Sequence, residues 1–166
     1  MTESDAIDAI ERQWRRERPD LDLAAMVVFA RLGRLAIVAE REIEAVFLAH
    51  GLRRGEFDVL AALRRAGAPF ELNPSGLAET LMLSRAGMTG RLDRLELAGY
   101  VRRIADTGDR RAVRVALTAA GQELVDTVVT DHTANETRML SALTAAERRE
   151  LDRIAGKLLT ALESGG

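Results

Sequence analysis

SRAGMTGRLDRLELAGYVRRIADTGDRRAVRVALT, the stretch from Ser84 to Thr118, decides the fold of this chain. Its first half predicts a helix, because Met88, Leu92 and Leu95 recur at helical spacing along one stripe. Gly99 follows as a stop signal. The spacing therefore predicts a helix that begins near Ser84 and buries a single side.

The second half of the stretch predicts a β hairpin. Tyr100 to Ala105 and Ala112 to Leu117 are short β-prone runs, and the second alternates apolar residues with smaller or charged ones. Residues 106–109, Asp-Thr-Gly-Asp, supply turn chemistry between the runs. A two-stranded wing is expected to follow the helix.

This stretch is basic although the whole chain is acidic. The chain carries a net charge of -2, whereas residues 85–114 carry +4, with eight arginines against four acidic residues. The arginines are at positions 85, 91, 94, 102, 103, 110, 111 and 114. A local basic patch is typical of a nucleic-acid reader.

The composition limits the remaining possibilities. A chain of 166 residues with 47% hydrophobic residues suits one domain with helical arms. It has no cysteine, which excludes disulfides, thiol redox sensing and cysteine zinc sites. Residues 1–18 lack the apolar core of a signal peptide, and no run is long enough to span a membrane. We expect a cytoplasmic protein with no membrane partner.

The segments before this stretch are also helical. Asn73 and Pro74 suit the cap and the first turn of a short helix that, with the helix from Ser84, predicts a helix-turn-helix. The helices expected up to this point are Asp5 to Arg18, Leu21 to His50, Arg54 to Arg65 and Ser75 to Leu81.

Two further helices are expected after the wing. Thr118 can cap the first, which runs to about Leu140, and Thr144 to Glu147 forms a capping box for the second. Both termini carry apolar stripes that a domain of this size cannot bury, which predicts a symmetric dimer. We expect residues 1–50 and 118–166 to serve dimerisation, with a DNA-binding lobe at 51–117. Two such lobes would match a pseudo-palindromic site.

Taken together, these features resemble the MarR family of bacterial winged-helix regulators. The resemblance rests on Asp109-Arg110-Arg111, on residues 115–118, on the helix from Ser84, and on the capped start of the final helix. It implies a mainly α fold with a small β wing and a recognition helix that enters the major groove. It also implies that Arg111, braced by Asp109, reaches into the minor groove, where arginine suits the negative potential, and that the protein represses transcription.

The expected recognition helix has an unusually bare outer face. Ala86 and Gly90 lie nearly opposite the apolar stripe at 100° per residue, so close approach to DNA is possible there. The candidates for DNA contact are Ser84, Arg85, Thr89, Arg94, Asp109, Arg110 and Arg111. The alternative is that these residues are only solvated surface.

A second resemblance concerns a ligand. The chain is similar to the urate-responsive branch of the family, which has an extra N-terminal helix with a tryptophan, and the matching residues are Trp14, Asp58, Arg91 and Arg103. An aromatic surface and guanidinium groups suit a planar anion. The resemblance implies a small anionic aromatic ligand, with urate as the first candidate, that weakens DNA binding through conformation.

Other interpretations remain open at this point. Trp14 could belong to the core, and Asp58 could form a structural salt bridge with Arg91 or Arg103. His50 and His132 have no ligand-spaced partners, so we expect a helix-end and a surface histidine, with no metal and no cofactor.

An enzyme is the first competing class, and the sequence has no phosphate loop, nucleophile elbow or clustered histidines to support one. The second is a dimeric winged-helix module that binds protein instead of DNA. Its affinity would depend much less on salt.

Overall fold

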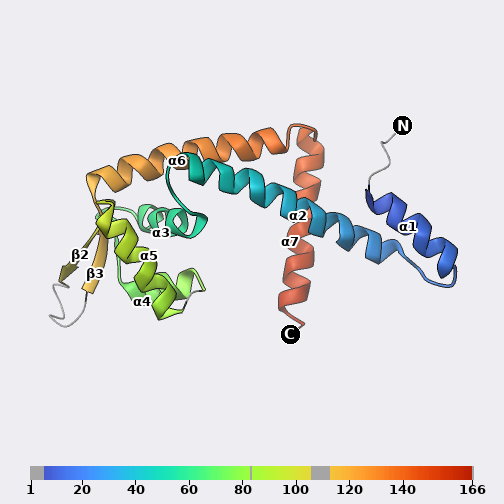
Figure 1. Ribbon diagram of the computed structural model, residues 1–166, viewed down its shortest axis with the longest axis horizontal. Helices are drawn as coiled ribbons and strands as arrows, with labels where there is room; N and C mark the ends of the chain where they lie inside the picture. The colour runs from blue at the N-terminus through green and yellow to red at the C-terminus, as the bar shows by residue number, and fades with distance from the viewer. Residues whose placement is uncertain (1–5, 83, 106–112, 166) are drawn as a thin grey trace. The chain divides into compact units, whose positions relative to one another are not determined.

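The computed structural model describes residues 6–82, 84–105 and 113–165 (Figure 1). The described chain is mainly helical with one small sheet, as predicted. In order, its elements are α1 (Ala6–Glu17), α2 (Ala24–Ala49), α3 (Arg54–Arg65), β1 (Glu71–Leu72), α4 (Pro74–Thr80), α5 (Arg85–Leu97), β2 (Val101–Ala105), β3 (Val113–Leu117), α6 (Ala119–Met139) and α7 (Ala145–Glu163).

The chain divides into two units, Met1–Glu42 and Ile43–Gly166, and each is described by itself. The functional division at residues 50 and 117 stays a prediction. Within the described residues, every helix is too short or too polar to cross a membrane.

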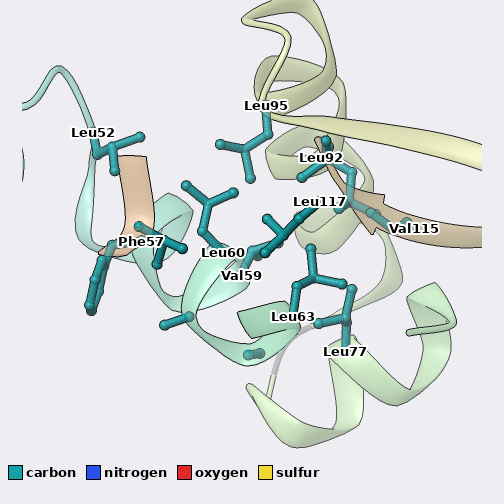
Figure 2. Close-up of a cluster of buried hydrophobic side chains, with 14 of the residues drawn as sticks. Leu52, Phe57, Val59, Leu60, Leu63, Leu77, Leu92, Leu95, Val115 and Leu117 are labelled. Carbon is teal, nitrogen blue, oxygen red and sulfur yellow. The ribbon is translucent and has the colours of Figure 1, made fainter. Parts of the chain in front are cut away.

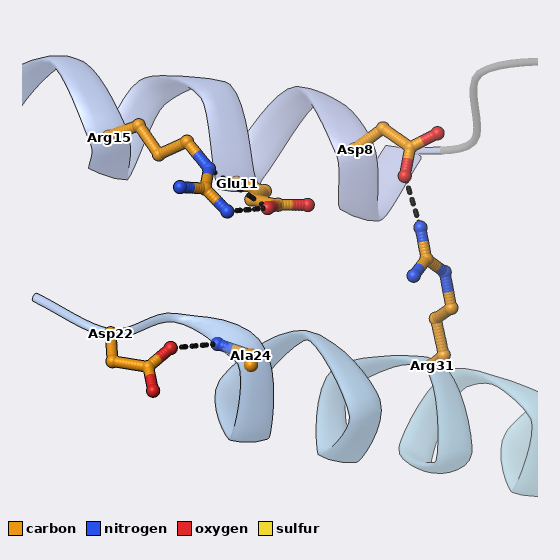
Figure 3. Close-up of polar contacts among 6 residues, drawn as sticks. All are labelled: Asp8, Glu11, Arg15, Asp22, Ala24 and Arg31. Carbon is orange, nitrogen blue, oxygen red and sulfur yellow. Dashed lines mark hydrogen bonds and ion pairs between the residues drawn. The ribbon is translucent and has the colours of Figure 1, made fainter.

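The first unit consists of α1 and most of α2, held together by charge and by a few apolar contacts. Arg31 on α2 forms an ion pair with Asp8 on α1, and Arg15 pairs with Glu11 along α1 (Figure 3). Ile7 is 8% exposed. The predicted N-terminal helix is therefore present and packs on its neighbour.

The sheet has three strands in the order β1-β3-β2, all antiparallel. Strands β2 and β3 form the predicted wing, with Arg103 opposite Val115. Strand β1 was not predicted, because two residues are too few to show an alternating pattern. Glu71 on β1 also forms an ion pair with Arg114 on β3, with 3.5 Å between Oε2 and Nε.

The core of the second unit lies between α3, α4, α5, α6 and the sheet. Leu60 and Leu63 of α3 lie near Leu77 of α4 and Val115 of β3 (Figure 2). The predicted inward stripe of α5, Met88, Leu92 and Leu95, is 1–2% exposed. This buried stripe fixes which side of α5 faces outward.

The predicted helix caps are confirmed. The Asn73 side chain accepts a hydrogen bond from the Gly76 backbone N–H at 2.6 Å, and Ser84 Oγ accepts one from Gly87 at 3.1 Å. Thr118 caps α6, and Thr144 with Glu147 forms the capping box of α7. The two caps of the helix-turn-helix satisfy N–H groups that would otherwise lack partners.

The prediction of a surface histidine at position 132 was wrong. The His132 ring packs against Phe47 and Phe57, with ring centroids 5.1 and 5.5 Å away. Its side chain is only 16% exposed. His50 does follow the end of α2, and its Nε2 lies 2.8 Å from Asp131 Oδ2. Sequence spacing could not reveal the rings around His132 or the Asp131 partner of His50, because α2, α3 and α6 meet only in the folded chain.

Candidate functional site

Several described residues on the outward face of α5 are small, as expected. Ala86, Gly87 and Thr89 are exposed, and Gly90 is half-buried. Ser84 caps this helix and Arg85 is its first residue. Ala86, Gly87 and Thr89 are small, so another molecule can approach the backbone of the helix closely at these positions. Gly90 lies beside Arg94, because a Cβ atom there would be 3.8 Å from Arg94 Nη1.

Arg94, a predicted DNA contact, forms an ion pair that joins α5 to α3. Its Nε donates to Glu56 Oε1 at 2.6 Å, and Glu56 is the buried charged residue of the described chain, 7% exposed. The other Glu56 oxygen accepts from the Arg53 backbone N–H at 2.9 Å. Burial raises the pKa of Glu56, but the hydrogen bonds from Arg94 and Arg53 outweigh it, so this pKa lies below its usual value.

Arg103, a predicted ligand residue, is held by two carboxylates of α5. Its Nη2 lies 2.6 Å from Asp93 Oδ1, and its Nη1 pairs with Glu96. Its backbone N–H also donates to Glu96 at 3.0 Å. The hydrogen bond to Asp93, followed by the contacts with Glu96, raises the pKa of Arg103, so the guanidinium stays charged. We call these three residues the Arg103 clamp.

Arg91 and Asp58, the next two predicted ligand residues, are close enough to interact electrostatically. Arg91 Nη1 donates to the Gly55 carbonyl at 3.4 Å. A Cβ atom at Gly55 would lie 2.4 Å from the Arg91 guanidinium carbon, so the glycine makes room for that group. Burial raises the pKa of Asp58, and the nearby positive charges, Arg54 first and Arg91 next, lower it only in part.

The structure therefore brings together some of the predicted ligand residues. Arg91 lies near Asp58, whereas Arg103 pairs with Asp93 and Glu96. Trp14 belongs to the first unit and is 41% exposed in the single chain. In this chain Trp14 is not the core residue that one alternative suggested.

The basic patch is less available than its charge count indicates. Arg94, Arg103 and Arg114 each form ion pairs within the protein. Arg102 is exposed on β2 and was not singled out from the sequence, although its alternation with Arg103 points it to the other face of the strand. The predicted contacts Asp109, Arg110 and Arg111 lie outside the described residues, as does the Arg85 side chain.

Within the described ranges, no three His, Cys, Asp or Glu side chains gather as a metal site would require. The geometry around α5 is instead that of a helix with several small exposed residues, joined by arginine–carboxylate pairs to α3 and to β2.

Comparison with known proteins gives the same picture. The sequence pattern of the MarR family matches residues 50–112. The HTH-type transcriptional regulator PecS of Dickeya dadantii is 41% identical over 152 residues, which cover 92% of each chain.

Solved structures agree on the fold. The YusO protein of Bacillus subtilis is 26% identical with a TM-score of 0.67, over 85% of this chain and 99% of that one. Sco3205 of Streptomyces coelicolor, a MarR family regulator solved in complex with DNA, is 21% identical with a TM-score of 0.73, over 86% and 89% of the two chains. The chain has a capped helix-turn-helix and a β wing, and it is similar to PecS over nearly its whole length. It therefore belongs to the MarR family of winged-helix transcriptional regulators.

Proposed function

We propose that this protein is a homodimeric DNA-binding regulator that represses transcription from a pseudo-palindromic site. The observation that carries the proposal is the outer face of α5 with its small exposed residues, opposite its buried stripe. Ser84, Arg85 and Thr89 would contact DNA from this helix. Arg94 lies at the far end of this helix, and its side chain is 51% exposed although it pairs with Glu56, so it could also face DNA. Asp109, Arg110 and Arg111 of the wing complete the proposed contacts. A regulator of transcription acts on the chromosome, so the proposal places it in the cytoplasm.

Exposed apolar faces on the terminal helices support the dimer. On α7, Leu151, Ile154, Leu158 and Leu162 are 38–65% exposed in the single chain, and α2 exposes Phe29, Leu35 and Ile37 to 57% each. Many exposed apolar side chains on two long helices favour burial against a second copy. Such a dimer would present two α5 helices to one duplex.

A small anionic aromatic ligand, with urate as the first candidate, would release the DNA. Arg91 near the half-buried Asp58 supports this part of the proposal, as does the exposed ring of Trp14. A planar anion could pair with the Arg91 guanidinium. Because Arg91 lies on α5, its pairing with a ligand would act directly on the position of the recognition helix.

The test is a mobility-shift titration on a duplex from upstream of the protein's own gene, at several salt concentrations, with and without urate. We expect a specific complex whose affinity falls steeply as salt rises and which urate dissolves. A specific complex that ignores urate would reject the ligand while leaving the regulator in place.

Two variants separate the roles. Arg111→Ala should lower DNA affinity and leave the dimer intact, and Arg91→Ala should abolish the response to urate more than it weakens DNA binding. If binding is insensitive to salt and to Arg111→Ala, a winged-helix module that binds protein is the better description.

A further inference from the structure

The Arg103 clamp joins the recognition helix to the first strand of the wing. Asp93 and Glu96 are three residues apart on α5, so both side chains lie on one face of the helix. Arg103 lies in the middle of β2, opposite Val115 of β3. The clamp therefore connects α5 to the sheet as a whole, since β2 is hydrogen-bonded to β3.

The clamp holds the main chain of β2 as well as a side chain. Glu96 accepts from the Arg103 backbone N–H at 3.0 Å and pairs with the guanidinium of the same residue. Asp93 binds the other amino group at 2.6 Å. A residue fixed at its backbone and at both guanidinium nitrogens has little freedom to turn, and the pairing is charge-assisted.

The clamp is only partly exposed to water. The side chains of Arg103 and Glu96 are 32% and 38% exposed, so solvent screens this pair less than it would a fully exposed one. The Asp93 side chain is 59% exposed, so solvent screens its pair with Arg103 more strongly. The partners of Arg103 in the clamp all belong to the chain itself. The role we infer for Arg103 is therefore separate from the ligand contact that the sequence predicted.

We propose that Arg103 is a positioning residue for DNA binding, which sets the angle between β2 and α5 so that wing and recognition helix engage the duplex together. This inference rests on the proposed function. DNA contacts made by separate elements add their free energies fully only when the protein holds those elements in the bound geometry beforehand.

The experiment measures DNA affinity of the full-length dimer by fluorescence anisotropy in ligand-free buffer, as a function of salt. The variants are Asp93→Asn with Glu96→Gln, which removes the two negative charges of the clamp and leaves Arg103 charged, and Arg103→Lys, which keeps the positive charge but replaces the guanidinium fork by a single ammonium group. We expect roughly tenfold weaker binding for the double variant and a smaller loss for Arg103→Lys. The slope of log affinity against log salt should become shallower by about 0.9 for each phosphate that the protein no longer neutralises.

Footprinting separates positioning from a general loss of structure. Hydroxyl-radical protection in the minor groove should weaken, while protection of guanine N7 in the major groove under α5 should persist. Asp126→Asn is the matched control, because it removes another arginine–carboxylate pair, with Arg64, away from the clamp. This control should change neither affinity nor footprint.

Three outcomes would overturn the inference. In the first, clamp variants bind DNA as tightly as the natural chain. In the second, both kinds of protection disappear equally, which indicates only a structural role. In the third, the natural chain forms no specific complex, and the proposed function fails as well. If the double variant does not fold by circular dichroism, Arg103→Lys decides the question.

Discussion

Nε of Arg94 on α5 lies 2.6 Å from Oε1 of Glu56 on α3, and this carboxylate is buried. Forming the pair costs desolvation free energy. Removing one partner destabilises the fold more, because the other charge is left buried without a counter-ion. The side chain of Arg94 is 51% exposed and that of Glu56 only 9%, so the carboxylate is the vulnerable partner.

We therefore expect Arg94→Ala to lower the free energy of unfolding at pH 7 by about 1 to 3 kcal/mol. The folded-state pKa of Glu56 is lowered, so the pair stabilises the fold above the unfolded-state pKa of this residue and loses its effect as pH falls through the folded-state value. Urea unfolding at pH 7 and in acid checks this. An equal loss at both pH values would contradict it, and adding Glu56→Gln to Arg94→Ala should recover part of the stability.

Gly121, near the start of α6, gives a prediction about packing. A Cβ atom there would lie 1.9 Å from the Tyr100 carbonyl oxygen, which belongs to the backbone and cannot turn aside. Gly121→Ala should cost about 1 to 3 kcal/mol or more of unfolding free energy, measured by thermal or urea unfolding. Gly156→Ala on α7 is the control, since the space around Gly156 is open, and it should gain up to about 1 kcal/mol from helix propensity. A neutral Gly121→Ala would show that α6 can move away from Tyr100.

Asp58 should change stability with pH in the opposite direction to Glu56. Its folded-state pKa is raised by burial, so the native state binds more protons than the unfolded state between the two pKa values. Stability should consequently fall as pH rises through this window. Asp58→Asn should be more stable than the natural chain at pH 7, and the difference should vanish below the unfolded-state pKa. Unfolding curves across the acid range would reveal it, and a destabilised Asp58→Asn at pH 7 would contradict the assignment.

The apolar face of α7 gives a prediction about assembly. Leu158 is 40% exposed in the single chain, so Leu158→Glu should shift the dimer toward monomer by placing a charge in the proposed interface. Sedimentation velocity at a range of concentrations measures the shift. Lys157→Glu, at the neighbouring exposed position on α7, should stay dimeric. If the leucine variant also stays dimeric, the interface lies elsewhere.

The helices could be predicted from the sequence because their signals are local. The stripe of Met88, Leu92 and Leu95 repeats within one helix, and the caps at Ser84 and Thr144 act within three residues. Propensity, periodicity and capping all operate over such short separations.

The partners of the arginines could not be predicted in the same way. Periodicity places Arg94 on an outer side of its helix, but it does not reveal that Glu56, 38 residues earlier, comes to lie against it. The same holds for Arg103, which pairs across the turn between α5 and β2. Net charge over a segment therefore overstated how many guanidinium groups remain available to DNA.

The close contact between Gly121 and Tyr100 also has a mechanical consequence. Thr118 donates to the Gly99 carbonyl at 2.7 Å and accepts from the Gly121 N–H at 3.0 Å, so α6 starts directly on the turn that ends the recognition helix. A helix of 21 residues is about 30 Å long. If α6 moves as a rigid rod about this junction, a tilt of about 5° displaces its far end by about 2 to 3 Å. A small rotation of the recognition helix would then be coupled to a larger displacement of the far end of α6.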